Sequence, residues 1–132
     1  MKAIDTNILI RFLTGDEQAQ AEMVYAFFKK AESEKTELFV PLLIVLEMIW
    51  VLESVYEVSR TEILDAISDL LLMPVLKFDQ HAILQQLIRS AQGNTFDLSD
   101  LLIAHAAKTS GCEKVITFDK DAAKFNLFEL LR

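Results

Sequence analysis

The chain has 132 residues, 52% of them hydrophobic, with 3 glycines and 2 prolines, so it can form one buried core and contains no linker. We therefore expect a single domain over residues 1–132. The net charge of −7 excludes a basic coat that binds nucleic acid non-specifically. The longest apolar run falls short of the ~20 residues that span a bilayer, and the first residues lack a signal-peptide pattern. We expect a cytoplasmic protein with no membrane partner.

Short apolar runs alternate with helical patterns along the chain. Asp5, Thr6 and Asn7 are favoured caps for the first helix, and Pro41 suits the first turn of a later one. The expected elements, in chain order, are a strand over residues 1–4, helices over 8–13 and 17–33, a strand over 38–40, helices over 42–52 and 59–73, a strand over 75–78, helices over 79–92 and 97–110, a strand over 114–118, a helical turn over 122–125 and a further strand over 127–130. This alternation predicts an α/β fold, with a mainly parallel central sheet of four to five strands and helices on both faces.

The helices expected over residues 17–33 and 42–52 have different patterns of apolar residues. In residues 17–33 we expect the packed face to be formed by the apolar residues that recur at helical spacing, which are Ala19, Met23, Ala26, Phe27 and Ala31. Residues 42–52 are apolar throughout, except at Glu47. A buried unpaired carboxylate costs on the order of several kcal/mol, so we expect Glu47 to meet a cation, either a metal ion or a side chain such as Arg11.

Several acids are expected to converge on one metal site. Asp5 and Asp119 directly follow predicted strands, and open α/β sheets bind ligands at the carboxyl ends of their strands. Asp97 and Asp100 lie three residues apart near a helix start, so either can join the same pocket. Hard divalent cations prefer oxygen ligands, and neither histidine nor the one cysteine has a partner at zinc-ligand spacing. The set therefore favours Mg²⁺ or Mn²⁺.

This inventory of acids suits hydrolysis of a phosphodiester. A bound divalent metal can activate water and polarise the phosphate, so the reaction needs no protein nucleophile. The expected direct ligands are Asp5 and Asp100, and the expected ligands that bind directly or through water are Glu47 and Asp119. Auxiliary groups that orient carboxylates or solvent are expected at Thr6, Asn7 and Thr117.

Each of these acids except Glu47 also has an ordinary structural explanation. Asp5, Asp97 and Asp100 suit helix N-termini, where acids cap the helix or meet the positive end of its dipole. Asp119 and Asp121 fit a polar turn that follows a strand. Both interpretations stay open, and Asp97 and Asp121 are assigned mainly structural roles.

Four segments stand in a characteristic order: residues 1–16, the isolated Glu47, residues 96–104 and residues 115–121. Together they resemble PIN-domain ribonucleases, specifically VapC-type toxins, from the first element to the last. The resemblance implies an α/β/α sandwich whose acidic pocket binds Mg²⁺ or Mn²⁺ and cleaves RNA as an endonuclease. By motif position, the four acids of such a pocket are Asp5, Glu47, Asp100 and Asp119. Two further positions that are often acidic in the family are Asp97 and Asp121.

The same resemblance implies three partners: an RNA substrate, a VapB-like antitoxin that blocks the pocket, and a second copy of the toxin in a homodimer. Because the chain is acidic, we expect RNA contact to be local. The basic residues expected to provide it are Arg11, Lys108, Lys120 and Lys124.

Two other functions fit parts of the pattern. A receiver-like signalling domain also gathers acids and Mg²⁺ at strand ends, but it needs an acceptor aspartate after a central strand. The candidate there is Asp79, which is expected to cap a helix instead. A catalytically idle PIN-fold module that binds a partner would keep the fold without the activity, and Asp100→Asn separates it from a nuclease.

Overall fold

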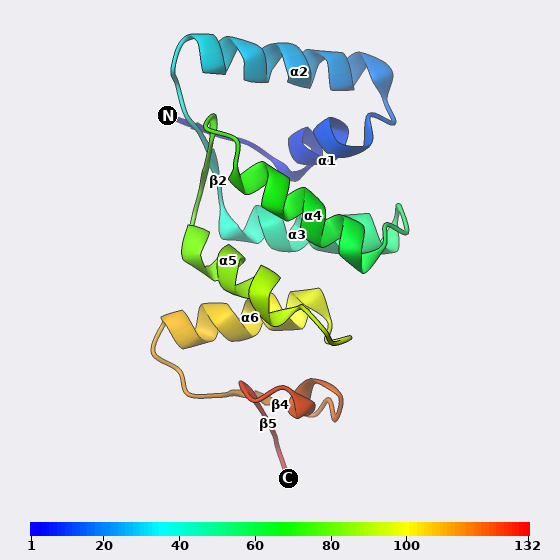
Figure 1. Ribbon diagram of the computed structural model, residues 1–132, viewed down its shortest axis with the longest axis vertical. Coiled ribbons are helices and arrows are strands. Elements are labelled where there is room, and N and C mark those ends of the chain that lie inside the picture. Colours follow the sequence, from blue (N-terminus) through cyan, green and yellow to red (C-terminus); the bar gives the residue numbers. More distant parts are fainter. The chain divides into compact units, whose positions relative to one another are not determined.

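A computed structural model describes residues 1–132, which divide into two units, unit 1 (Met1–Gln80) and unit 2 (His81–Arg132). In Figure 1, unit 1 runs from blue to green and unit 2 from green to red. Each unit is described by itself below, and the expectation of one domain stays a prediction. None of the helices combines the length and the apolar character that a membrane crossing requires.

Unit 1 is built on a parallel sheet with the strand order β1-β2-β3. Its elements are β1 (Lys2–Ala3), α1 (Thr6–Thr14), α2 (Gln18–Ser33), β2 (Leu38–Val40), α3 (Leu42–Ser54), α4 (Arg60–Leu71) and β3 (Leu76–Phe78). In the register of the sheet, Leu38 of β2 lies between Lys2 of β1 and Leu76 of β3. Helix α1 packs against α2 and α3, and α4 packs against α3. Helices α1 and α3 directly follow β1 and β2, so both begin at the edge of the sheet where these strands end.

Unit 2 pairs a two-helix layer with two parallel strands. Its elements are α5 (His81–Ser90), α6 (Leu98–Thr109), β4 (Val115–Thr117), the 3₁₀ helix η1 (Ala122–Lys124) and β5 (Phe128–Leu130). Helix α5 packs along α6 (Figure 1). A small core of Ala104, Ala122 and Phe128 joins α6 to η1 and β5. This core fixes the start of η1 beside the helix that carries Asp100.

The predicted element order and the parallel α/β character are confirmed, and local capping explains why. Ser59 Oγ accepts the N–H of Glu62 at the start of α4, and Gly15 (φ 64°) ends α1 in the left-handed conformation. Asp79 does not cap α5, contrary to the prediction. Its N–H donates to the carbonyl oxygen of Val40 and extends the β2–β3 pairing, and α5 begins two residues later.

The predicted inward face of α2 is wrong at Met23 and Phe27 and correct at Ala31. Met23 is 71% exposed and Phe27 is 38% exposed, whereas the buried side chains are Ala21, Val24, Phe28 and Ala31. Both faces of this helix carry aromatic and small residues, so periodicity alone did not distinguish them. The ring of Phe28 decides the packing because it meets Phe12 of α1 at a centroid distance of 5.0 Å.

Arg11 lies in a polar network that ties the loop after α1 to the rest of unit 1. Its Nε donates to Gln20 Oε1 at 2.7 Å, and its Nη1 lies 3.2 Å from Asp16 Oδ1. Tyr56 Oη donates to the second oxygen of Asp16 at 2.7 Å. The Tyr56 hydroxyl is the main cause that lowers the pKa of Asp16, with Thr14 and Arg11 adding to it. Arg11 therefore has a structural role on this side of the unit.

Replacing Tyr56 by Phe should lower the melting temperature by a few degrees at neutral pH, because it removes a hydrogen bond to a carboxylate. Since the folded-state pKa of Asp16 is lowered, its contribution is present above the unfolded-state pKa and is lost as pH falls. The difference between the variant and the wild type should therefore shrink under acid. Thermal unfolding of both proteins across pH measures this, and a difference that does not change with pH would contradict it.

Candidate active site

In unit 1, two of the candidate acids are associated with one edge of the sheet. Asp5 follows β1 and its carboxylate accepts the N–H of Thr6 at 2.7 Å, so it caps α1. Glu47 lies in the second turn of α3, the helix that follows β2. Because β1 and β2 are parallel neighbours, α1 and α3 start at the same edge. Topology thus assigns Asp5 and Glu47 to helices that start from one side of the sheet.

The expectation that Glu47 is buried is wrong, because its side chain is exposed. One face of α3 points outward and carries Leu43 (75% exposed), Glu47 and Trp50 (60% exposed) at helical spacing. The opposite face buries Val45 and Met48. Neighbours in the sequence surround Glu47 with apolar residues, but the helix separates them onto different faces. Its candidacy now depends on its position after β2 and no longer on burial.

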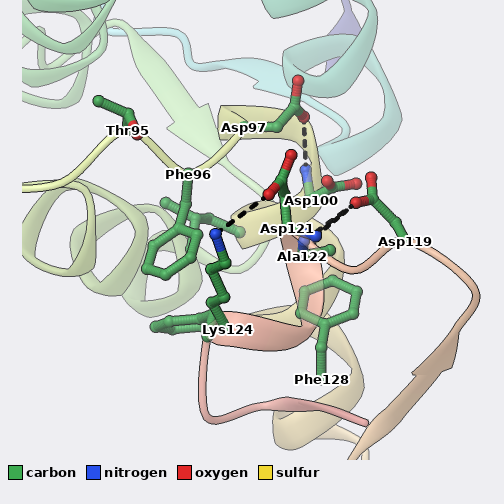
Figure 2. A pocket seen from close by; sticks show the side chains of 11 residues that line it. Thr95, Phe96, Asp97, Asp100, Asp119, Asp121, Ala122, Lys124 and Phe128 are labelled. Carbon is green, nitrogen blue, oxygen red and sulfur yellow. Dashed lines mark hydrogen bonds and ion pairs between the residues drawn. The ribbon is translucent and has the colours of Figure 1, made fainter. Parts of the chain in front are cut away.

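In unit 2, four carboxylates line one pocket of about 390 Å³. Figure 2 shows two of them at the start of α6 and two on the segment between β4 and η1. The full lining is Thr95, Phe96, Asp97, Asp100, Leu101, Asp119, Asp121, Ala122, Lys124, Phe125 and Phe128. The pocket thus combines acids, one lysine and an aromatic wall.

Asp97 and Asp100 have different tasks at the start of α6. Asp97 is the N-cap, and its Oδ1 accepts the N–H of Asp100 at 2.9 Å. Asp100 is half-buried, and burial raises the pKa of its carboxyl, with the charges of Asp97 and Asp119 raising the pKa further. A carboxylate that is desolvated beside two like charges is stabilised by a cation. Asp100 is the acid here that most needs one.

Asp119 is held in a defined orientation by backbone donors. Its Oδ1 accepts the N–H of Asp121 at 2.8 Å and that of Ala122 at 3.2 Å, as Figure 2 shows. Its own N–H donates to Thr117 Oγ1 at 3.0 Å. These bonds leave the second carboxylate oxygen of Asp119 without a protein donor. Thr117 therefore contacts the backbone of Asp119.

The pocket fits a hard divalent cation with a partly aqueous shell. No group of three or more His, Cys, Asp or Glu side chains is arranged to enclose a metal ion by itself. Mg²⁺, however, is commonly held by one or two carboxylates while it keeps several waters. Asp100 and the free oxygen of Asp119 meet that requirement, and the raised pKa of Asp100 indicates charge that a cation would compensate.

The remaining predicted residues have distinct environments. Thr6 is buried and its Oγ1 has no hydrogen-bond partner, while Asn7 is exposed on the first turn of α1. Lys108 and Lys120 are exposed and do not line the pocket of unit 2. Lys124 does line it, and its Nζ lies 3.3 Å from Asp121 Oδ1.

The aromatic wall of this pocket was not predicted from the sequence. Phe96 and Phe125 lie with ring centroids 5.2 Å apart, and both line the pocket. The available signal was the position of each ring, since Phe96 precedes Asp97 and Phe125 follows Lys124. Their contact depends on the turn between β4 and β5, which sequence patterns do not define.

His105 links α5 to α6 through a hydrogen bond with Ser90. Ser90 Oγ donates to the carbonyl oxygen of Leu87, so it accepts from His105 Nε2–H at 2.8 Å. This assignment leaves His105 Nδ1 buried without a partner. Burial lowers the pKa of His105, and the positive charge of Lys108 lowers it further.

Stability should therefore fall as pH decreases through about 6.5, because the unfolded chain then binds a proton that folded His105 resists. In His105→Gln this part of the pH dependence should disappear. His81→Gln is the matched control, since His81 is exposed at the start of α5, and it should keep the wild-type pH profile. Chemical denaturation across pH measures all three proteins. Equal pH profiles for wild type and His105→Gln would contradict the assignment.

Comparison with known proteins adds independent information. The model of the PIN domain family matches residues 2–126. The VapC ribonuclease of Aquifex aeolicus (strain VF5) is 26% identical over 120 residues, which cover 91% of this chain and 88% of that protein. The family match extends across Asp5 and Glu47 in unit 1 and the acids in the pocket of unit 2. The family match favours the PIN interpretation over the receiver-like alternative.

Proposed function

Because the chain belongs to the PIN domain family, we propose that it is a divalent-metal-dependent endoribonuclease that acts in the cytoplasm as the toxin of a toxin–antitoxin pair. The observation that carries the proposal is the pocket in which Asp100 and Asp119 lie together, with a raised pKa at Asp100. The similarity to a protein named VapC ribonuclease supports RNA as the substrate class.

In this proposal Asp100 and Asp119 hold Mg²⁺ or Mn²⁺ in unit 2. When bound, the cation supplies positive charge and water activation for hydrolysis of a phosphodiester. The protein contributes orientation: two backbone N–H groups fix one oxygen of Asp119, and Asp97 fixes the first turn of the helix that carries Asp100. Thr117 holds the backbone of Asp119. A fixed carboxylate geometry lowers the reorganisation needed for metal binding.

Asp5 and Glu47 complete the proposed set of acids, on the basis of motif position. The cap geometry of Asp5 is compatible with this role, since only one of its oxygens is engaged by Thr6. Exposure of Glu47 leaves it accessible to solvent and ions. Single Asn or Gln replacements at these two positions are expected to reduce cleavage without unfolding the chain.

The proposed partners are a VapB-like antitoxin and a second copy of this chain. Unit 1 exposes large apolar side chains on α2 and α3, among them Met23, Leu43 and Trp50. Exposed apolar surface of this kind supports contact with another protein chain.

The direct test is cleavage of RNA by the purified chain with Mg²⁺ or Mn²⁺, with and without a chelator. The proposal expects discrete new 5′ ends that disappear when the metal is removed. Inducing the chain in cells and mapping new RNA 5′ ends then identifies the target without a guess at the substrate. A pure, folded protein that cuts no RNA with either metal, and produces no new ends in cells, would favour the idle PIN-fold module.

A further inference from the structure

The pocket of unit 2 holds a single cationic side chain among four carboxylates. The cation is Lys124, and the carboxylates belong to Asp97, Asp100, Asp119 and Asp121. An RNA strand is a polyanion, so phosphates that enter this pocket meet a repulsive field unless a cation offsets it. A metal ion offsets part of this charge. Lys124 is the only lining residue of the protein that can add to that effect.

The geometry around Lys124 is built by the same turn that orients Asp119. Lys124 ends η1, and its Nζ lies 3.3 Å from Asp121 Oδ1. The N–H groups of Asp121 and Ala122 both donate to Asp119 Oδ1, which fixes the start of η1 (Figure 2). The side chain of Lys124 is 72% exposed and that of Asp121 is 90% exposed. Such a pair contributes little to stability. It keeps the ammonium group beside the turn that orients Asp119.

We propose that Lys124 binds a phosphate of the RNA strand next to the one that is cleaved, and that Asp121 positions Lys124 and is not a metal ligand. This inference rests on the proposed function and names the residues that recognise its substrate. The Asp121 carboxylate already faces a cation of the protein, unlike that of Asp100. The other expected basic residues are less suited, because Lys108 and Lys120 do not line the pocket and Arg11 is bound by Gln20 and Asp16 in unit 1.

The test is steady-state cleavage of a short single-stranded RNA that contains a mapped cleavage site, at several salt concentrations. In Lys124→Gln, KM should rise about tenfold while kcat stays within about twofold of wild type, because a phosphate contact acts mainly on binding. The slope of log(1/KM) against log salt should become shallower by about 0.7, the value for one phosphate contact on a single strand. Lys124→Arg should recover most of the wild-type KM.

Asp121→Asn separates positioning from metal binding. If Asp121 positions Lys124, the variant should raise KM and keep the full rise in melting temperature that Mn²⁺ gives the wild type. The double variant with Lys124→Gln should have the KM of Lys124→Gln alone, since the two residues act as a unit. Loss of the Mn²⁺-induced rise in Asp121→Asn would make Asp121 a metal ligand and overturn this part of the inference.

Lys29→Gln is the matched control, because Lys29 is exposed on α2 and the replacement changes the net charge equally. It should leave KM and the salt slope unchanged. The assignment of Lys124 is overturned if wild type cleaves RNA but Lys124→Gln keeps its KM and slope, or if Lys29→Gln has the same effect as Lys124→Gln, which would indicate bulk charge. In both cases the proposed nuclease function stands. Absence of cleavage by the wild type would overturn the function and this inference together.

Discussion

Replacing Asp100 by Asn is expected to reduce RNA cleavage about a thousand-fold, with the fold intact. The reason is that Asp100 is the half-buried carboxylate of the pocket, and burial together with Asp97 and Asp119 raises its pKa, which marks it as the acid that a cation would stabilise most. Removing its charge weakens the binding of the metal ion, which contributes several kcal/mol to phosphodiester hydrolysis. Each ~1.4 kcal/mol corresponds to a tenfold change in rate. The measurement is a map of new RNA 5′ ends after induction at matched protein levels.

Asp65→Asn is the matched control for this experiment. Asp65 is exposed on α4 in unit 1, and its replacement removes the same charge. It should reproduce the wild-type map, whereas Asp100→Asn should reproduce the uninduced one. Circular dichroism of both variants establishes that they are folded. Wild-type cleavage by folded Asp100→Asn would remove Asp100 from the site and with it the central observation of the proposed function.

The order and type of the elements were predictable because their signals are local. A helix start needs one side chain that accepts a free N–H, and Ser59 and Asp97 meet that requirement wherever the chain later packs. A helix end at Gly15 needs only a residue that tolerates a positive φ. Such decisions involve neighbours within a few residues, which is the range that sequence reading covers well.

The buried faces of α2 and α3 were less predictable, because they depend on partners that are distant in the chain. Residues of α3 are apolar almost all round, so no periodic stripe indicated that Glu47 faces outward. On α2, the choice between Phe27 and Phe28 was settled by Phe12 of another helix. Where two registers are both apolar, tertiary contacts decide.

The pocket of unit 2 also has features that were predictable from the sequence and features that were not. The spacing of Asp97 and Asp100 on one helix turn is a local property, and the sequence predicted that either can join a pocket with Asp119. The positions of Lys124 and Phe96 around those acids depend on how η1 folds back after β4. The acids and Lys124 could therefore be named from the sequence, whereas the aromatic wall beside them could not.

Addition of Mn²⁺ or Mg²⁺ should stabilise the wild-type chain and have little effect on Asp100→Asn. A ligand that binds only the folded state at a hundred times its Kd adds about 2.7 kcal/mol of stability, which corresponds to a rise in melting temperature of about 10 °C for a chain of this size. The stabilisation should disappear on chelation. Differential scanning fluorimetry with and without chelator measures it directly.

In the absence of metal, Asp100→Asn should be more stable than the wild type at neutral pH. Because the folded-state pKa of Asp100 is raised above 3.8, its ionised form destabilises the folded chain at neutral pH, and this cost vanishes below the unfolded-state pKa. Asp100→Asn removes the cost, so the metal-free variant should melt higher than metal-free wild type at pH 7 and should lose that advantage as pH falls toward 3.8. Asp65→Asn should show neither effect. Equal stabilisation of wild type and Asp100→Asn by the metal would mean that the ion is held by other groups. Only a metal bound at Asp100 would offset the electrostatic cost of its ionised carboxylate.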